Sequence, residues 1–380
     1  MSIFEHIILF SLLFIVYAFW GKYLVNKDGT DFWSVAIFPI LLFVFVIGSR
    51  YGWGNDYFWY KEQFENPEFI IDQPAFKWLN QFLNVLGFNY VGAYMIYALI
   101  FIISAFVFLR SYGEPSRYMY CFLVPATFYA SCWTIRQGVG FSFVFLALTC
   151  FHQQKWLPMA LLVLIALNIH SATFVSFAIL LGIFFLLKKP IHYWISIPLY
   201  IYGTFILDPH KISLLEGLIT QHLSFDNKFQ GYIDRSEAWF GEEAITTEWQ
   251  QGTFALIVLS LFYISIIYLG YRALKARENK QVLYIYNTAV LGMIMLKAVW
   301  LYEILRRFPQ YMEILYFIPL GYIFYVYFRD CKQPKNHDAA MLKKHFPVGI
   351  TLILAYLFMY YGRFLLLNPR ADFFWHHLNY

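Results

Sequence analysis

Residues 50–60 place polar and aromatic side chains directly after a long apolar run. The segment reads RYGWGNDYFWY and combines one arginine, one aspartate and two glycines with several aromatic rings. A guanidinium binds anions, a carboxylate accepts protons or hydrogen bonds from hydroxyls, and aromatic faces can stack on sugars. Such a set is typical of a site for a polar headgroup or a sugar.

Each of these side chains also has a role that needs no ligand. Asp56 could act on a hydroxyl nucleophile, cap its own turn or pair with Arg50. Tyr57 and Tyr60 are candidate substrate contacts, but rings at this position also fit the aromatic belt of a membrane protein. For the rings we favour the belt.

Arg136 and Gln137 follow a very short turn, WTIRQG, between two apolar runs. A charge there is costly in lipid unless it meets a partner or a water-filled cavity. We therefore interpret Arg136 as a ligand for an anionic group, with Gln137 beside it.

His170 occupies a similar position, because the sequence LNIHSA separates two further apolar runs. Its ordinary pKa lies near neutrality, so the imidazole could transfer a proton during catalysis. A hydrogen-bonded cap at a helix end explains the residue equally well.

A fourth group consists of Lys297, Glu303, Arg306 and Arg307. Spacings of three and four residues bring the Glu303 carboxylate within reach of either arginine on a helix. The group could be an internal ion pair, or Glu303 could direct one arginine toward a ligand whose cavity Lys297 lines. Because ionisable groups inside a membrane are candidates for function, we prefer the second interpretation.

The rest of the chain is suited to hydrocarbon. Of its 380 residues, 60% are hydrophobic and only 13% are charged, against about 25% charged in a soluble protein. The sequence predicts an all-α, polytopic bundle of about 12 helices in a single integral membrane domain, residues 1–380. The predicted spans are 3–21, 32–49, 90–109, 118–133, 137–151, 157–169, 171–187, 191–207, 252–271, 281–301, 309–328 and 346–366. The pair around His170 could be a tight hairpin, a broken helix or a re-entrant pair.

Lysines and arginines gather in alternate loops, and short basic loops stay in the cytoplasm. Both termini are then outside, together with a first outer loop at 50–89, an acidic outer loop at 208–251 and a tail at 367–380. The tail could fold back over the site or anchor at the membrane interface, and we favour anchoring.

Within the first outer loop, apolar residues recur at helical spacing and predict an amphipathic helix in the interface. These residues are Phe76, Leu79, Leu83 and Leu86.

Several arginines lie on the predicted outer side, whereas the inner loops prefer lysine. A guanidinium matches phosphate or carboxylate oxygens with two hydrogen bonds, so the set could hold a diphosphate, although each arginine could instead reach the lipid headgroups. The outer arginines are Arg50, Arg136, Arg235, Arg306, Arg307, Arg363 and Arg370.

The sequence lacks the motifs of several other functions. There is no Walker loop, dinucleotide fingerprint, HExxH or GxSxG, and the four cysteines have no paired spacing. We predict no metal and no cofactor. The net charge of +5 comes from the cytoplasmic loops and does not indicate nucleic-acid binding.

Over about residues 45–310 the chain resembles the EpsG-type branch of bacterial polysaccharide polymerases, which is related to Wzy. Short motifs in a fixed order carry the resemblance: RYG at 50, GNDY at 54 with Tyr60, RQ at 136, HSA at 170 and RRF at 306. Trp53 departs from the pattern, and we expect it to influence sugar preference.

The resemblance implies a multi-pass enzyme of the bacterial inner membrane with its active site facing the periplasm or exterior, for which a glycosyltransferase-C-like architecture is one candidate. Such enzymes assemble exopolysaccharide, capsule or O-antigen from oligosaccharides linked to undecaprenyl diphosphate. The implied partners are this lipid-linked oligosaccharide, the lipid bilayer, a chain-length regulator and a flippase.

A compatible reaction has a hydroxyl of the incoming unit attack the anomeric carbon of the growing chain and release undecaprenyl diphosphate. Arg136 with Arg306 or Arg307 would hold the diphosphate in place of a metal ion, while Arg50 positions it. His170 or Asp56 would receive the hydroxyl proton.

Three other functions would use the same ligand. A single-addition lipid-linked glycosyltransferase and an O-antigen ligase would also work on the outer side. A flippase of lipid-linked sugars would instead show pseudo-repeated halves, which the sequence does not contain.

Overall fold

The computed structural model describes residues 3–54, 56–70, 73–132, 134–208, 252–367 and 372–377. Nearly all of these residues are helical, with one two-stranded sheet, so the predicted all-α class is confirmed. Apart from Asp208, the predicted acidic loop lies outside the described residues.

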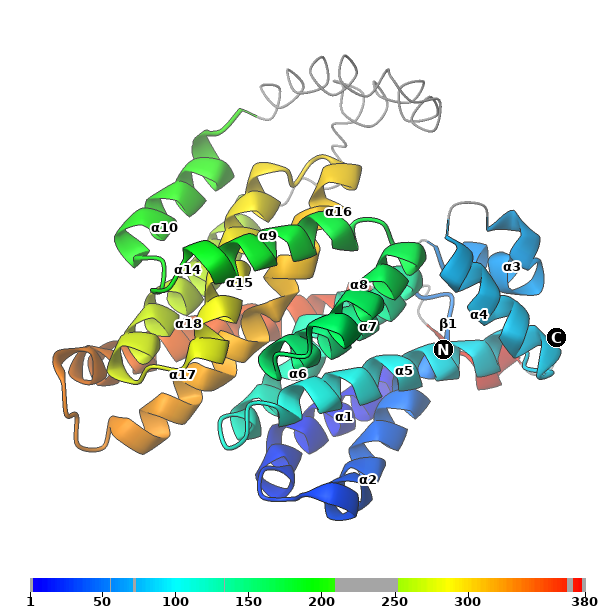
Figure 1. Cartoon of the computed structure of the whole chain (residues 1–380), viewed down its shortest axis with the longest axis horizontal. Coiled ribbons are helices and arrows are strands. Elements are labelled where there is room, and N and C mark those ends of the chain that lie inside the picture. The colour runs from blue at the N-terminus through cyan, green and yellow to red at the C-terminus, as the bar shows by residue number, and fades with distance from the viewer. Residues whose placement is uncertain are drawn as a thin grey trace. The chain divides into compact units, whose positions relative to one another are not determined.

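The elements follow one another along the chain as Figure 1 labels them. The first half contains α1 (Ile3–Leu24), α2 (Gly29–Gly48), β1 (Arg50–Tyr51), α3 (Tyr57–Glu65), the 3₁₀ turn η1 (Pro67–Phe69), α4 (Pro74–Val85), α5 (Tyr90–Arg110), α6 (Ser116–Cys132), α7 (Ile135–His152), α8 (Trp156–Ile169) and α9 (Thr173–Leu186). The second half contains α10 (Tyr193–Ile201), the π-helical turn η2 (Tyr202–Ile206), α14 (Thr253–Ala276), α15 (Lys280–Ala298), α16 (Glu303–Glu313), η7 (Ile314–Tyr316), α17 (Phe317–Asp330), α18 (His337–Leu367), β2 (Asp372–Phe373) and η8 (Phe374–His377).

Eight helices of the described chain are long and apolar enough to cross a membrane. They begin at Phe4, Gly29, Tyr90, Ile135, Thr253, Lys280, Leu305 and His337. The protein is therefore a multi-pass membrane protein. The predicted number of about 12 stays a prediction, because several of the remaining apolar helices are short.

The interruption predicted near His170 separates two such short helices. α8 ends at Ile169, His170 is extended with φ −151° and ψ 109°, and α9 begins at Thr173. Each helix has 14 residues. At about 1.5 Å per residue each covers about 21 Å, less than the hydrocarbon core of about 30 Å.

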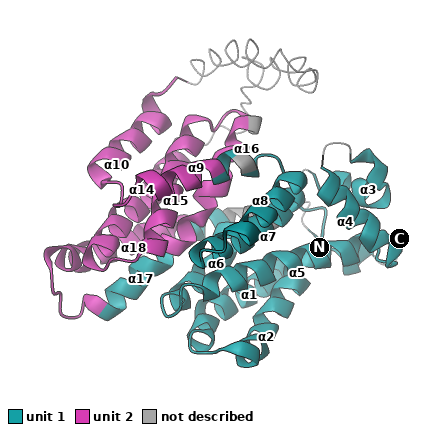
Figure 2. Ribbon diagram, in the orientation of Figure 1, with its two compact units in different colours: residues 1–177, 320–329, 357–380 teal, residues 178–319, 330–356 magenta. Residues whose placement is uncertain are grey.

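The chain divides into two compact units, coloured separately in Figure 2. Unit 1 comprises residues 1–177, 320–329 and 357–380. Unit 2 comprises residues 178–319 and 330–356. Each unit is assembled from separate stretches of chain.

In unit 1, two glycines shape the turn after α2. Gly52 and Gly54 have φ of +68° and +83°, a region that other residues rarely adopt. The turns direct Trp53 inward, where it is completely buried and its ring lies 5.2 Å from that of Phe10. Trp53 is thus a core residue of unit 1, which provides no support for the expectation that it influences sugar preference.

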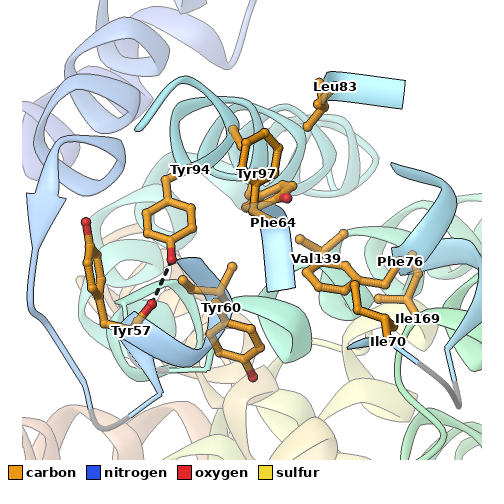
Figure 3. Close-up of a cluster of buried hydrophobic side chains, with 12 residues drawn as sticks. Tyr57, Tyr60, Phe64, Ile70, Phe76, Leu83, Tyr94, Tyr97, Val139 and Ile169 are labelled. Carbon is orange, nitrogen blue, oxygen red and sulfur yellow. Dashed lines mark hydrogen bonds between the residues drawn. The ribbon is translucent and has the colours of Figure 1, made fainter. Parts of the chain in front are cut away.

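The first outer loop folds back onto the helices of unit 1. α3 packs against α5, and α4 against α8 (Figure 1). Their shared apolar cluster joins the loop to the starts of α5 and α7 and to the end of α8 (Figure 3). The cluster contains Tyr57, Tyr60, Phe64, Ile70, Phe76, Leu83, Ala93, Tyr94, Tyr97, Ile135, Val139 and Ile169.

The helix predicted inside this loop is α4, which starts with Pro74 as its first residue. Phe76 and Leu83 face the protein core, although we expected them to face the interface. The apolar residues exposed along the helix and at its end are Trp78, Phe82, Val85 and Leu86, so that Leu86 is exposed as expected. α4 therefore has two apolar faces, and only one of them is covered by described residues.

In unit 2, α15 is central and packs against α14, α16 and the turns η2 and η7. Gly292 allows its contact with α16, because a Cβ there would lie 2.4 Å from the Glu313 nitrogen. The Tyr286 hydroxyl donates a hydrogen bond to the Ile267 carbonyl of α14 at 2.8 Å. These contacts hold the predicted residues around Lys297 in place.

Candidate functional site

Among the described lysine and arginine side chains of unit 1, Arg50 is the most deeply buried, with 2% of its surface exposed. It follows α2 directly, and its Nη1 donates a hydrogen bond to the Ile47 carbonyl. The guanidinium carbon lies 5.4 Å from the centre of the Tyr94 ring. Its Nε has no hydrogen-bond partner in the described part of the chain, and no described carboxylate forms an ion pair with Arg50.

Two tyrosines line the surroundings of Arg50. The Tyr94 hydroxyl donates a hydrogen bond to the Tyr57 carbonyl at 2.8 Å (Figure 3). The Tyr57 hydroxyl is buried and lacks a hydrogen-bond partner among the described residues. Burial raises the pKa of this hydroxyl far above its ordinary value, and the nearby Arg50 charge opposes the rise only in part. Tyr57 is therefore a neutral hydroxyl with a proton to donate.

Arg136 is half-buried in the first turn of α7, as its position in the short turn between two apolar runs predicts. Its Nη1 donates a hydrogen bond to the Gln73 side-chain oxygen, and its guanidinium lies 5.9 Å from the Tyr60 ring centre. Its Nε, like that of Arg50, is buried without a hydrogen-bond partner in the described residues.

The two arginines belong to the same part of unit 1. Tyr60 under Arg136 and Tyr94 under Arg50 both belong to the apolar cluster of the outer loop (Figure 3). Neither arginine forms an ion pair with a described carboxylate. Burying a cation without an opposite charge is unfavourable by several kcal/mol, so this arrangement favours an anionic ligand.

The other predicted residues of unit 1 surround the same cluster. His170 is 8% exposed and directly follows the cluster residue Ile169, while Gln137 is buried beside Arg136. Asp56 precedes α3 but forms no side-chain cap hydrogen bond. The structure thus shows neither this cap nor an ion pair with Arg50, and the proposed action of Asp56 on a hydroxyl stays a prediction.

Unit 2 holds the remaining predicted residues. The Lys297 amine lies 4.4 Å and the Arg306 guanidinium 6.0 Å from the ring centre of Trp300. Both cations therefore lie near the same indole ring. Both side chains are buried, whereas Arg307 is partly exposed. The side chain of Glu303 lies outside the described part of the chain.

A carboxylate that we did not select from the sequence lies close to this pair. The Tyr263 hydroxyl donates a hydrogen bond to Glu313 Oε1, and the Glu313 and Lys297 charges attract one another. Glu313 is the last residue of α16 and has apolar neighbours on both sides in the sequence, so the rule that selected Lys297 could also have found it. No signal in the sequence indicates Tyr263 or Gln73.

These groups can perform two kinds of chemistry. The arginines of unit 1 can bind an anion in partly dehydrated surroundings, and His170 or Asp56 can exchange a proton. Among the described residues no group of three or more histidine, cysteine, aspartate or glutamate side chains is arranged to hold a metal ion.

Comparison with known proteins identifies the family of the chain. No curated protein and no solved structure matches the chain. The sequence model of the EpsG family matches residues 33–363, a range that includes every predicted site residue. Because this match covers most of the chain, the protein belongs to the EpsG family.

Proposed function

We propose that the protein is a polysaccharide polymerase of the bacterial inner membrane. It transfers a growing glycan from undecaprenyl diphosphate to a hydroxyl of the next lipid-linked repeat unit, on the periplasmic or exterior side. Membership of the EpsG family supports a polymerase-like role, and the apolar helices support the membrane setting. The observation that carries the proposal is the pair Arg50 and Arg136, two buried or half-buried guanidiniums that form no ion pair with a described carboxylate.

The chemistry follows from what these groups offer. The acceptor oxygen bonds to the anomeric carbon while the bond from that carbon to the diphosphate oxygen breaks. The diphosphate leaves with the bonding electrons, and Arg50 and Arg136 stabilise its charge by hydrogen bonds that need no reorganisation. The acceptor proton passes to His170 or Asp56. Tyr57 is an additional hydrogen-bond donor for a phosphate or sugar oxygen.

Unit 2 contributes a second cationic set to the proposal. Lys297, Arg306 and Arg307 would bind the second lipid-linked substrate or the glycan, with Glu303 directing one of the arginines. Glu313 joins this set because it neutralises Lys297 in part. We assign no transfer step to these residues.

The direct test uses purified protein in lipid nanodiscs with a lipid-linked repeat unit as the sole substrate. A ladder of products supports a polymerase, whereas one-step products indicate a single-addition transferase or ligase. Translocation in vesicles without any product would indicate a flippase and overturn the proposal.

A test in cells addresses the named residues. Arg136→Ala and His170→Ala should each shorten the polymer and lower its yield at normal protein levels. Unchanged polymer length and yield in both variants would refute the assignment of these residues.

A further inference from the structure

The last described residues, 372–377, form a C-terminal strap that folds back onto the start of the first outer loop. β2 pairs antiparallel with β1, so that Phe373 lies opposite Arg50 and Asp372 opposite Tyr51. The Phe374 nitrogen donates a further hydrogen bond to the Ser49 carbonyl at 3.0 Å. The strap thus holds the backbone of the residue that carries the most buried of the described guanidiniums in unit 1.

Aromatic packing secures the strap, while the expected anchoring of the tail at the membrane interface stays a prediction. Phe373 is completely buried, with its ring 4.5 Å from that of His6 and 5.6 Å from that of Trp53. His377 stacks on Tyr51 at 3.8 Å between ring centres. A ring buried in this way contributes about 1.5–3 kcal/mol, which suffices to keep a short segment docked.

Charged groups add a second attachment to α1. Trp375 Nε1 donates a hydrogen bond to Glu5 Oε1 at 2.8 Å, and His376 Nε2 lies 2.9 Å from the other oxygen of Glu5. Asp372 accepts hydrogen bonds from the Phe373 nitrogen and contacts both His376 and His377. Residues 372–377 and Glu5 lie outside the range that matches the EpsG family, residues 33–363.

From these contacts we infer that the strap positions Arg50 for the anionic group of the substrate, with Phe373 as the positioning residue. The inference rests on the proposed function. Arg50 makes only one side-chain hydrogen bond to described residues, so its orientation depends on where its backbone is held. Loss of the strap would leave Arg50 chemically intact but free to shift.

The test combines Phe373→Ala with Arg50→Ala in a double-mutant cycle on purified protein. If Phe373 acts through Arg50, each single variant should lower kcat/KM for the lipid-linked unit by roughly 10- to 100-fold. The double variant should then be no worse than the poorer single variant within about twofold, since both changes disable one interaction. Multiplied losses would mean that Phe373 serves only the stability of unit 1, and they would overturn the inference.

Phe374→Ala is the matched control, because it makes the same change one residue later at a partly exposed ring. It should leave kcat/KM unchanged. Restoring activity by a cross-link gives an independent readout. Tyr51→Cys and Asp372→Cys are added to the Phe373→Ala chain, where oxidation should form a disulfide between these paired positions and hold the strap on β1. Oxidation should then restore the activity lost in Phe373→Ala, and reduction should remove it again. Cross-linking without rescue would contradict the positioning role.

These outcomes separate the inference from the proposed function. If the wild-type chain forms no glycan product, the proposed function fails. If wild type is active and Arg50→Ala is also fully active, the strap has no catalytic arginine to position and the inference alone fails.

Discussion

Arg136→Lys tests whether the guanidinium fork, rather than a positive charge alone, binds the anionic group. In the structure one nitrogen of the fork is engaged with Gln73, while the buried Nε lacks a described partner. Arginine can therefore offer a phosphate two parallel hydrogen bonds, and lysine would keep the charge but lose this geometry.

The size of the effect follows from the bond that is lost. A hydrogen bond to a charged group contributes about 1.5–3 kcal/mol, and about 1.4 kcal/mol corresponds to a factor of ten. We expect Arg136→Lys to raise KM for the lipid-linked unit by roughly 10- to 100-fold. Thermal stability should hardly change, since the site is only half-buried and the charge is kept.

The assay is steady-state kinetics of glycan extension in nanodiscs, with protein amount and melting temperature measured in parallel. Arg110→Lys is the matched control, because Arg110 lies on a basic loop predicted to be cytoplasmic, pairs with Asp28 and is partly exposed. It should behave as wild type. If the Arg136→Lys variant had the same KM as the control, the proposal that the guanidinium geometry binds the anionic group would be refuted.

Three further predictions concern stability. Gly292→Ala should destabilise unit 2 by about 1–3 kcal/mol, because the added Cβ would meet the backbone of Glu313. Gly182→Ala is the control, since open space surrounds Gly182 and the change should not destabilise the protein. Thermal unfolding in detergent compares the two variants. In the same assay, Tyr263→Phe should cost about 1–3 kcal/mol by removing the hydrogen bond to Glu313. Glu313→Leu should also destabilise the protein, because it removes this hydrogen bond and the attraction between the Glu313 and Lys297 charges. Equal stability of wild type and Glu313→Leu would contradict the interaction. Burial alone would raise the pKa of Asp372, but the Phe373 nitrogen and the two neighbouring histidines lower it below its ordinary value. Asp372 therefore stabilises the docked strap above its unfolded pKa of about 3.9, and this contribution is lost as the pH falls through the lower folded value. Hydroxyl-radical footprinting should show that Trp375 becomes more reactive as the pH is lowered from 6 to below this folded value, and Asp372→Asn should abolish the change. A wild-type reactivity that does not rise over this range would count against the prediction.

The membrane character, the helical class and the family could be predicted from sequence because they depend on local composition and on short motifs. The break at His170 and the first turn of α7 at Arg136 also follow from apolar runs that end at polar residues. These are features of neighbouring residues in the chain, and the structure places them close to where the sequence indicates.

Contacts between distant segments could not be predicted in this way. Helical periodicity identified α4 but not what its apolar face packs against, so Phe76 and Leu83 were expected at the interface and are buried in the protein. The contact between Gln73 and Arg136 joins residues 63 positions apart, and no local pattern encodes it. The same holds for the pairing of β1 with β2.

That pairing also has a consequence for how the protein is made. β1 leaves the ribosome long before β2, and all of unit 2 is synthesised between the two strands. Until residues 372–377 emerge, Trp53 lacks the ring of Phe373 and β1 lacks its partner strand. Domains often complete their folding as they are synthesised. Unit 1 is an exception to this order, because it can reach its described form only after residues 372–377 have been translated.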